Sequence, residues 1–119
     1  MQEQHINLLS VTIRYISKNN ESFLSYSKDD SFAIVFYINQ GLSKKEIKKA
    51  EKWTQKIVDL AIENNGTYYL TYQLYPTQEQ IREVYHEIDN FFLEKKKYDS
   101  EERFMNKFYA KYALGEEDE

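Results

Sequence analysis

Two segments near the start of the chain have the hydrophobic spacing of β-strands, and this spacing limits the fold more than any other feature of the sequence. From Leu9 to Ile16 apolar and polar side chains alternate, which predicts a strand with one buried face within residues 6–16. Residues 32–38 form a continuous apolar run, which predicts a central strand covered on both faces. The polar residues 17–30 between them predict a loop.

Helical spacing follows in the middle of the chain. Ser43 and Glu46 have the spacing of a capping box, and apolar residues then recur every three or four positions as far as Asn64. Asn65 and Gly66 tolerate the left-handed backbone with which many helices end. We therefore expect one long helix that begins after Ser43 and ends at Asn64.

A second helical pattern begins at Thr77, which stands three residues before Gln80 and again has the spacing of a capping box. An apolar stripe at helical spacing follows and predicts one long helix that ends near Lys97. A shorter helix is expected after it. The stripe of the long helix consists of Ile81, Val84, Tyr85, Ile88, Phe91 and Phe92, and that of the short helix of Phe104, Phe108 and Tyr112.

Residues 67–74 alternate in a way that predicts a third strand. The order strand, strand, helix, strand, helix, helix predicts an α+β fold: a small, mainly antiparallel sheet of three or more strands with helices packed on one face, in a ferredoxin-like arrangement. A length of 119 residues suits one domain, which we place at residues 1–114. The acidic residues 115–119 are expected to form a disordered tail.

The composition excludes several kinds of active site. Without cysteine the chain has no disulfide, thiolate zinc ligand or cysteine nucleophile. Its three glycines, at positions 41, 66 and 115, cannot form the glycine-rich loops that bind phosphate groups. His86 lies near carboxylates on the predicted second helix, but further ligands at suitable spacing are lacking. We expect no metal site, and no catalytic residue is identified.

Charge and hydropathy indicate neither a nucleic-acid partner nor a membrane span. The net charge is −4, and the lysines of the first predicted helix are not interleaved with the aromatic side chains on which bases stack. No apolar run reaches the ~20 residues that a membrane helix needs. The N-terminal residues lack the pattern of a secretory signal, so a cytoplasmic location is expected.

The eleven tyrosines admit two interpretations. Those within residues 67–74 are either ordinary strand residues packed in the core or part of a binding surface. In the second interpretation Tyr69 and Gln73 lie on the sheet face without helices, where a phenol and an amide can bind a polyol-like molecule. The spacing alone leaves both interpretations open.

Residues 65–74, 76–77, 97–99, 103–104, 106 and 108–109 follow one another in a distinctive order and spacing. This region resembles the C-terminal end of FAD-linked oxidases of the vanillyl-alcohol-oxidase-like family, which includes sugar-lactone and alditol oxidases and the decaprenylphosphoryl-ribose oxidase. Residues 8–14, 32–37 and 53–54 resemble substrate-domain segments of its bacterial members, so the similarity covers residues 6–113. Ser100 replaces the proline of the family's signature, and nothing in the chain matches the family's N-terminal FAD-binding domain.

The resemblance implies a role beside a flavin. In that family the C-terminal domain caps the flavin ring and forms much of the substrate pocket, where a hydride passes from a substrate C–H bond to the flavin. Asn106 matches the signature asparagine and is expected to position the last helix against the FAD-binding domain. The residues expected to line the pocket are Ser10, Thr12 and Arg14 from the first strand and Tyr69, Tyr72 and Gln73 from the third.

Arg14 is suited to hold an anionic substrate or the negative charge of a reduced flavin. Tyr69 and Tyr72 differ in parity along the strand, so both can face one pocket only at a bulge or a strand end.

The sequence thus leads to one main hypothesis and two others. The main one is a substrate or cap domain of an FAD-dependent oxidoreductase that acts on a sugar- or polyol-like substrate. It would be inactive alone, with FAD held by another domain or subunit. The alternative is a stand-alone ferredoxin-like binding or self-association module without catalysis, and a homodimer through an exposed aromatic face is expected. The third is a vestigial reading frame that folds without activity.

Overall fold

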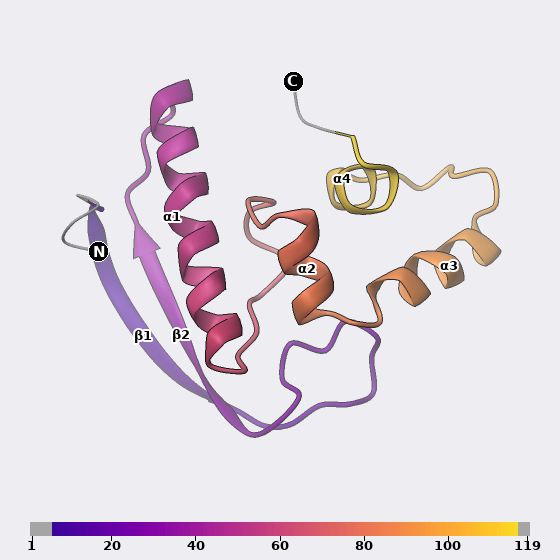
Figure 1. Cartoon of the computed structure of the whole chain (residues 1–119), viewed down its shortest axis with the longest axis horizontal. Coiled ribbons are helices and arrows are strands. Elements are labelled where there is room, and N and C mark those ends of the chain that lie inside the picture. The colour runs from indigo at the N-terminus through magenta and orange to yellow at the C-terminus, as the bar shows by residue number, and fades with distance from the viewer. Residues whose placement is uncertain (1–5, 117–119) are drawn as a thin grey trace.

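The computed structural model describes residues 6–116 and shows an α+β chain (Figure 1). The α+β class predicted from the sequence is confirmed. None of the helices within this range has the length and apolar character that crossing a membrane requires. Of the predicted tail, residues 117–119 lie outside the described part. The elements are β1 (Leu8–Ile16), β2 (Ser31–Ile38), α1 (Lys44–Glu63), α2 (Gln78–Val84), α3 (Ile88–Tyr98) and α4 (Lys107–Leu114).

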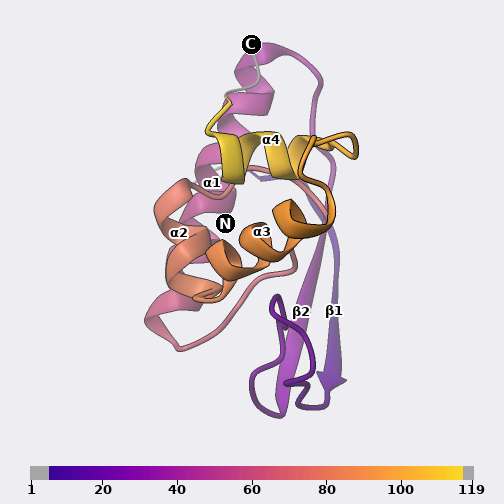
Figure 2. The same ribbon diagram turned by 90° about the vertical axis from the view of Figure 1, so that its right-hand side faces the viewer.

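The strands β1 and β2 form an antiparallel hairpin in which Ile13 pairs with Ile34. The hairpin runs beside α1 (Figure 1), and both strands lie on one side of that helix in the perpendicular view (Figure 2). Thr12, Ala33 and Val35 are half-buried and share one face, so this is the face turned toward the helices. The opposite face of the hairpin is open to solvent.

The prediction that residues 32–38 form a central strand covered on both faces is wrong. Among the described residues β2 pairs with β1 only, and the side chains of Phe32 and Ile34 are exposed. An apolar run favours burial of both faces of a strand, but it does not show that other elements of the same chain bury them. The strand therefore forms where it was predicted and lacks the neighbours that were expected.

The predicted third strand is absent from the described residues, since residues 67–74 form an irregular connector between α1 and α2. Side chains, and not a neighbouring strand, bind the backbone carbonyl groups of Tyr68 and Leu74, and also those of the next two residues. Gln55 Nε2 donates to the carbonyl of Tyr75 at 2.8 Å, and Tyr112 Oη donates to that of Pro76 at 2.8 Å. The Tyr85 hydroxyl donates in the same way to Tyr68. The sheet consequently has two strands where three or more were predicted.

The predicted apolar stripe of the second helical pattern is the core of the protein. Its residues Ile81, Val84, Tyr85, Ile88 and Phe92 are buried together with two tyrosines of α4. The single long helix predicted here is wrong, because α2 ends at Val84 and α3 begins at Ile88. At the break Tyr85 leaves helical geometry, with φ −112° and ψ 78°, and its ring remains buried. The break lets both helices turn their apolar sides toward one core.

The predicted helix starts are confirmed at α1 and α2. Ser43 and Glu46 form a complete capping box, as do Thr77 and Gln80. At the end of α1 it is Asn65 that takes the left-handed backbone, with φ 56°. The first helical residue of α4 follows Asn106, so Phe104 of the predicted short helix lies before the helix.

Replacement of Tyr112 by Phe tests the connector's attachment. Tyr112 is only 2 % exposed, and its hydroxyl is the buried partner of the Pro76 carbonyl. Removing the hydroxyl leaves that carbonyl without a partner, so the free energy of unfolding is expected to fall by about 1–2 kcal/mol. Urea denaturation followed by circular dichroism measures the change. The control Tyr98→Phe alters a ring that is 90 % exposed and should leave stability unchanged; equal losses in both variants would contradict this assignment.

Candidate functional site

Three tyrosines on the connector and on the hairpin loop form an exposed aromatic cluster, which we call the tyrosine cluster: Tyr26, Tyr69 and Tyr72. The Tyr69 ring stands edge-on to that of Tyr72, with centroids 5.2 Å apart, and edge-on to that of Tyr26 at the same distance. Tyr69 is 47 % exposed and Tyr72 68 % exposed. The cluster therefore presents phenol faces and hydroxyl groups to solvent.

The backbone around residue 70 explains why Tyr69 and Tyr72 meet despite their difference in parity. Residues 70 and 71 lie in a turn, so the alternation of a straight strand does not apply to them. Tyr68 points the other way and stands edge-on to the buried Tyr85, with ring centroids 5.6 Å apart. The Thr67 hydroxyl donates to the Tyr26 carbonyl and ties the connector to the hairpin loop. The turn thus brings both predicted tyrosines into one cluster.

The first-strand residues expected to line the same pocket lie elsewhere. Ser10, Thr12 and Arg14 are on β1, and Thr12 is half-buried on the face toward the helices. Within residues 6–116 no hydrogen bond or ring contact joins them to the tyrosine cluster. Gln73 follows Tyr72 in the chain and is exposed. The structure accordingly brings together Tyr69 and Tyr72 with Gln73 close in sequence, but not the three residues of β1.

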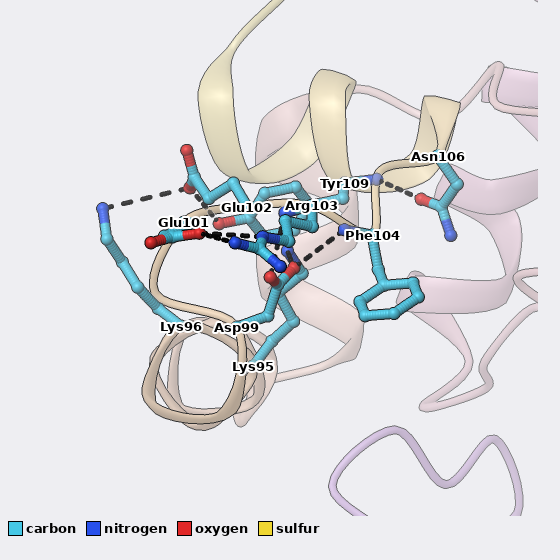
Figure 3. Close-up of polar contacts among 9 residues, drawn as sticks. All are labelled: Lys95, Lys96, Asp99, Glu101, Glu102, Arg103, Phe104, Asn106 and Tyr109. Carbon is cyan, nitrogen blue, oxygen red and sulfur yellow. Dashed lines mark hydrogen bonds and ion pairs between the residues drawn. The ribbon is translucent and has the colours of Figure 1, made fainter.

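Residues 99–106, between α3 and α4, form a compact polar turn (Figure 3). At its centre is Asp99, whose carboxylate accepts a hydrogen bond from Lys95 Nζ at 2.7 Å. It also accepts from the backbone N–H groups of Arg103 at 2.9 Å and Phe104 at 3.0 Å. The Lys95 hydrogen bond and the backbone donors hold the pKa of this carboxyl at about 2, below its ordinary value of 3.8. Asp99 is therefore the anion that fixes the turn.

Asn106 begins α4 as its N-cap. Its side-chain oxygen accepts from the backbone N–H of Tyr109 at 2.8 Å (Figure 3). The Tyr109 hydroxyl donates to Glu102 at 2.7 Å, and Lys95 Nζ lies 4.1 Å from the centre of the Tyr109 ring. The hydrogen bond to Glu102 raises the pKa of Tyr109. In this structure the predicted cofactor-positioning residue holds the first turn of a helix.

The polar and aromatic groups of the described residues are best arranged for binding at the tyrosine cluster. No group of three or more histidines, cysteines or carboxylates within residues 6–116 is arranged to hold a metal ion. His86 is exposed in the turn between α2 and α3, outside the helix on which it was expected. Burial raises the pKa of Tyr85 and of Tyr112, so both hydroxyls stay protonated and act as hydrogen-bond donors. The tyrosine cluster is the surface best suited to a ligand.

Tyr26 is the member of this site that sequence reasoning missed. It lies 43 positions before Tyr69, in a loop predicted only as irregular. No periodicity links the two residues, because their contact depends on how the loop of residues 17–30 folds back onto the connector.

Searches against protein-family models, curated proteins and solved structures found no match for the chain.

Replacement of Asp99 by Asn tests the polar turn through its pH dependence. The pKa of Asp99 in the folded chain is about 2, below the ordinary value of 3.8. Its contribution to stability is therefore present above pH 3.8 and is lost as the pH falls through about 2. We expect Asp99→Asn to unfold at lower urea concentration than the wild type at pH 7, and the difference to shrink steadily as the pH falls from 4 to 2.

The matched control for this pH test is Asp29→Asn. Asp29 also forms an ion pair, with Lys18 at 3.0 Å, but its side chain is 83 % exposed. Its replacement should change stability little at any pH. A difference between wild type and Asp99→Asn that stays constant from pH 7 to pH 2 would show that the carboxylate charge does not stabilise the turn.

Proposed function

We propose that this chain is the substrate-binding cap domain of an FAD-dependent oxidoreductase that oxidises a sugar- or polyol-like substrate. The observation that carries the proposal is the exposed tyrosine cluster, in which the rings of Tyr69 and Tyr72 are in contact and Gln73 follows in the chain. The alternation of residues 67–74 indicates Tyr69 and Gln73 as candidate ligand-binding residues, and the resemblance to FAD-linked oxidases adds Tyr72. The contact between Tyr69 and Tyr72 supports a shared ligand surface.

The cluster suits a polyhydroxylated ligand. A phenol ring offers an apolar face to the C–H groups of a sugar and a hydroxyl tip to its oxygen atoms. An edge-on pair such as Tyr69 and Tyr72 presents two ring surfaces that differ by 76° in orientation. The Gln73 amide adds a donor and an acceptor. These groups can bind and orient a substrate, while the redox chemistry needs a cofactor.

The FAD itself does not fit this chain. Its pyrophosphate needs a glycine-rich loop or a comparable row of backbone N–H groups, and the three glycines at positions 41, 66 and 115 are too far apart in sequence to form one. In our proposal another domain or subunit holds the FAD, and this chain contributes binding and orientation of the substrate. FAD would supply a hydride acceptor when bound there.

The ferredoxin-like sheet belongs to the same proposal. The outer edge of β1 has no strand partner among the described residues, so its backbone N–H and C=O groups can pair with a further strand. Strands supplied by the FAD-binding partner at this edge would give a sheet of three or more strands. The helices would then cover one face, as the sequence predicts.

A second candidate is a stand-alone self-association module without catalysis. The observation that favours it is the open, apolar face of the hairpin, which the helices of the chain do not cover. The two candidates use different surfaces, since the tyrosine cluster lies on the connector and the loop of residues 17–30 and not on either strand. They are therefore open to separate tests.

Cofactor retention by the isolated chain tests whether another domain or subunit binds the FAD. We expect the purified chain, incubated with excess FAD and passed over a desalting column, to retain none, because it lacks a phosphate-binding loop. Visible absorbance of the protein fraction measures the outcome. A stoichiometric yellow complex would overturn the assignment of FAD to another domain or subunit.

A reconstituted enzyme tests the role of the tyrosine cluster. The chain would be co-expressed with candidate FAD-binding domains of the FAD-linked oxidase family, and flavin bleaching by alditols would be followed without oxygen. Replacing Tyr69 and Tyr72 together by Ala should raise the KM for the alditol about 5- to 150-fold, since each ring contact contributes about 0.5–1.5 kcal/mol. Tyr98→Ala, at a ring exposed outside the cluster, is the control and should leave KM unchanged. No bleaching by any sugar or polyol would contradict the proposal.

A further inference from the structure

We propose that the open face of the β1–β2 hairpin binds the same face of a second copy of this chain. This face, called the hairpin face below, carries no charged residue. Its pairs Val11–Phe36, Ile13–Ile34 and Tyr15–Phe32 follow from the register of the two strands. The inference rests on the second candidate function above, self-association, which it deepens by naming the face and its partner, and it does not depend on the flavoenzyme proposal. Its residues are Val11, Ile13, Tyr15, Phe32, Ile34 and Phe36.

The hairpin face is open because the fold places its core elsewhere. Between 46 % and 72 % of each side chain is exposed at five of its six residues, and Phe36 is half-buried. No residue of either strand belongs to the buried core cluster or to the partly buried side chains packed against it. The perpendicular view shows both strands on one side of α1, with the other side of the hairpin uncovered (Figure 2).

The size of the face matches a small specific interface. With ~150–250 Å² for each aromatic side chain and somewhat less for each aliphatic one, its exposed part amounts to about 600 Å². That is the upper end of the largest apolar patches on monomers, which measure ~300–600 Å². Two such faces would bury about 1,200 Å², the lower end of the range for specific complexes. A second copy therefore supplies the area of a small specific interface, for which we expect a Kd in the micromolar range.

On the hairpin face the strands also lack the charged residues and prolines that normally prevent exposed strands from associating. β2 contains no charged residue, and the one charge of β1, Arg14, lies on the opposite face of the hairpin. Neither strand contains proline. A face without charges can pack against its own copy about a two-fold axis without bringing like charges together. The two hairpins would stack as two layers about 10 Å apart, as packed sheets do.

Analytical ultracentrifugation of the full chain tests this dimer. We expect the wild type to change from the 14.4 kDa monomer toward twice that mass as its concentration rises from ~1 µM to ~200 µM, which spans a micromolar Kd. Ile13→Lys places two like charges in the interface and should raise the dimer Kd at least ~100-fold. A wild type that remains monomeric at the highest concentration would overturn the proposal, and would leave the face to a different partner such as the FAD-binding domain.

The matched control is Tyr37→Lys. Tyr37 is also an exposed residue of the hairpin, but the register places it on the opposite face, so its replacement should leave the dimer intact. Equal loss of the dimer in both variants would overturn the assignment to the hairpin face. Circular dichroism checks that both variants fold. FAD retention and alditol oxidation are separate measurements, so either proposal can fail without the other.

A cross-linking experiment keeps the proposal testable if a lysine variant does not fold. Because the chain has no cysteine, a single introduced cysteine reports one position only. Ile13→Cys treated with a short bis-maleimide should give a covalent dimer on a denaturing gel, whereas Tyr37→Cys should remain monomeric. A covalent dimer from Tyr37→Cys alone would place the interface on the wrong face.

Discussion

Side chains that bind the backbone of residues 68–76 determine the arrangement of this protein. The hydroxyls of Tyr85 and Tyr112 reach the carbonyls of Tyr68 and Pro76, and Gln55 binds that of Tyr75. These bonds come from α1, from the α2–α3 break and from α4, so one connector joins elements that are distant in sequence. Buried carbonyls need partners, and here side chains supply them in place of a neighbouring strand. The two-stranded sheet and the turn that gathers the tyrosines both follow from this.

The sequence predicts local structure well where the determining contacts are local. Ser43 with Glu46, and Thr77 with Gln80, identify helix starts because capping involves residues three positions apart. The apolar stripe from Ile81 to Phe92 identifies the core for the same reason, since its residues share one side of a helix. The break at Tyr85 has no local signal in the sequence: there the Tyr85 hydroxyl binds the carbonyl of Tyr68, 17 positions away.

The candidate site shows the same limit. Strand spacing indicates Tyr69 and the resemblance adds Tyr72, but the parity of a straight strand would separate them, and it is the turn at residues 70–71 that lets their rings meet. The connection to Tyr26 depends on a loop whose course no periodicity describes. The alternation of residues 67–74 shows only that their side chains would suit a strand. Whether a strand forms also depends on what binds the backbone, and here side chains bind it in place of a neighbouring strand.

The distribution of apolar residues connects the two proposals. Strong alternation in β1 and a continuous apolar run in β2 are the patterns of strands that are covered, yet the buried core lies among α2, α3, α4 and the connector. The helices of this chain bury their apolar sides mainly against one another and do not cover the outer face of the hairpin. That face and the free edge of β1 need different partners, because a face is covered by apolar side chains whereas an edge is completed by backbone hydrogen bonds. A second copy can cover the hairpin face while a strand of an FAD-binding partner pairs with the edge of β1, so the two proposed assemblies are compatible.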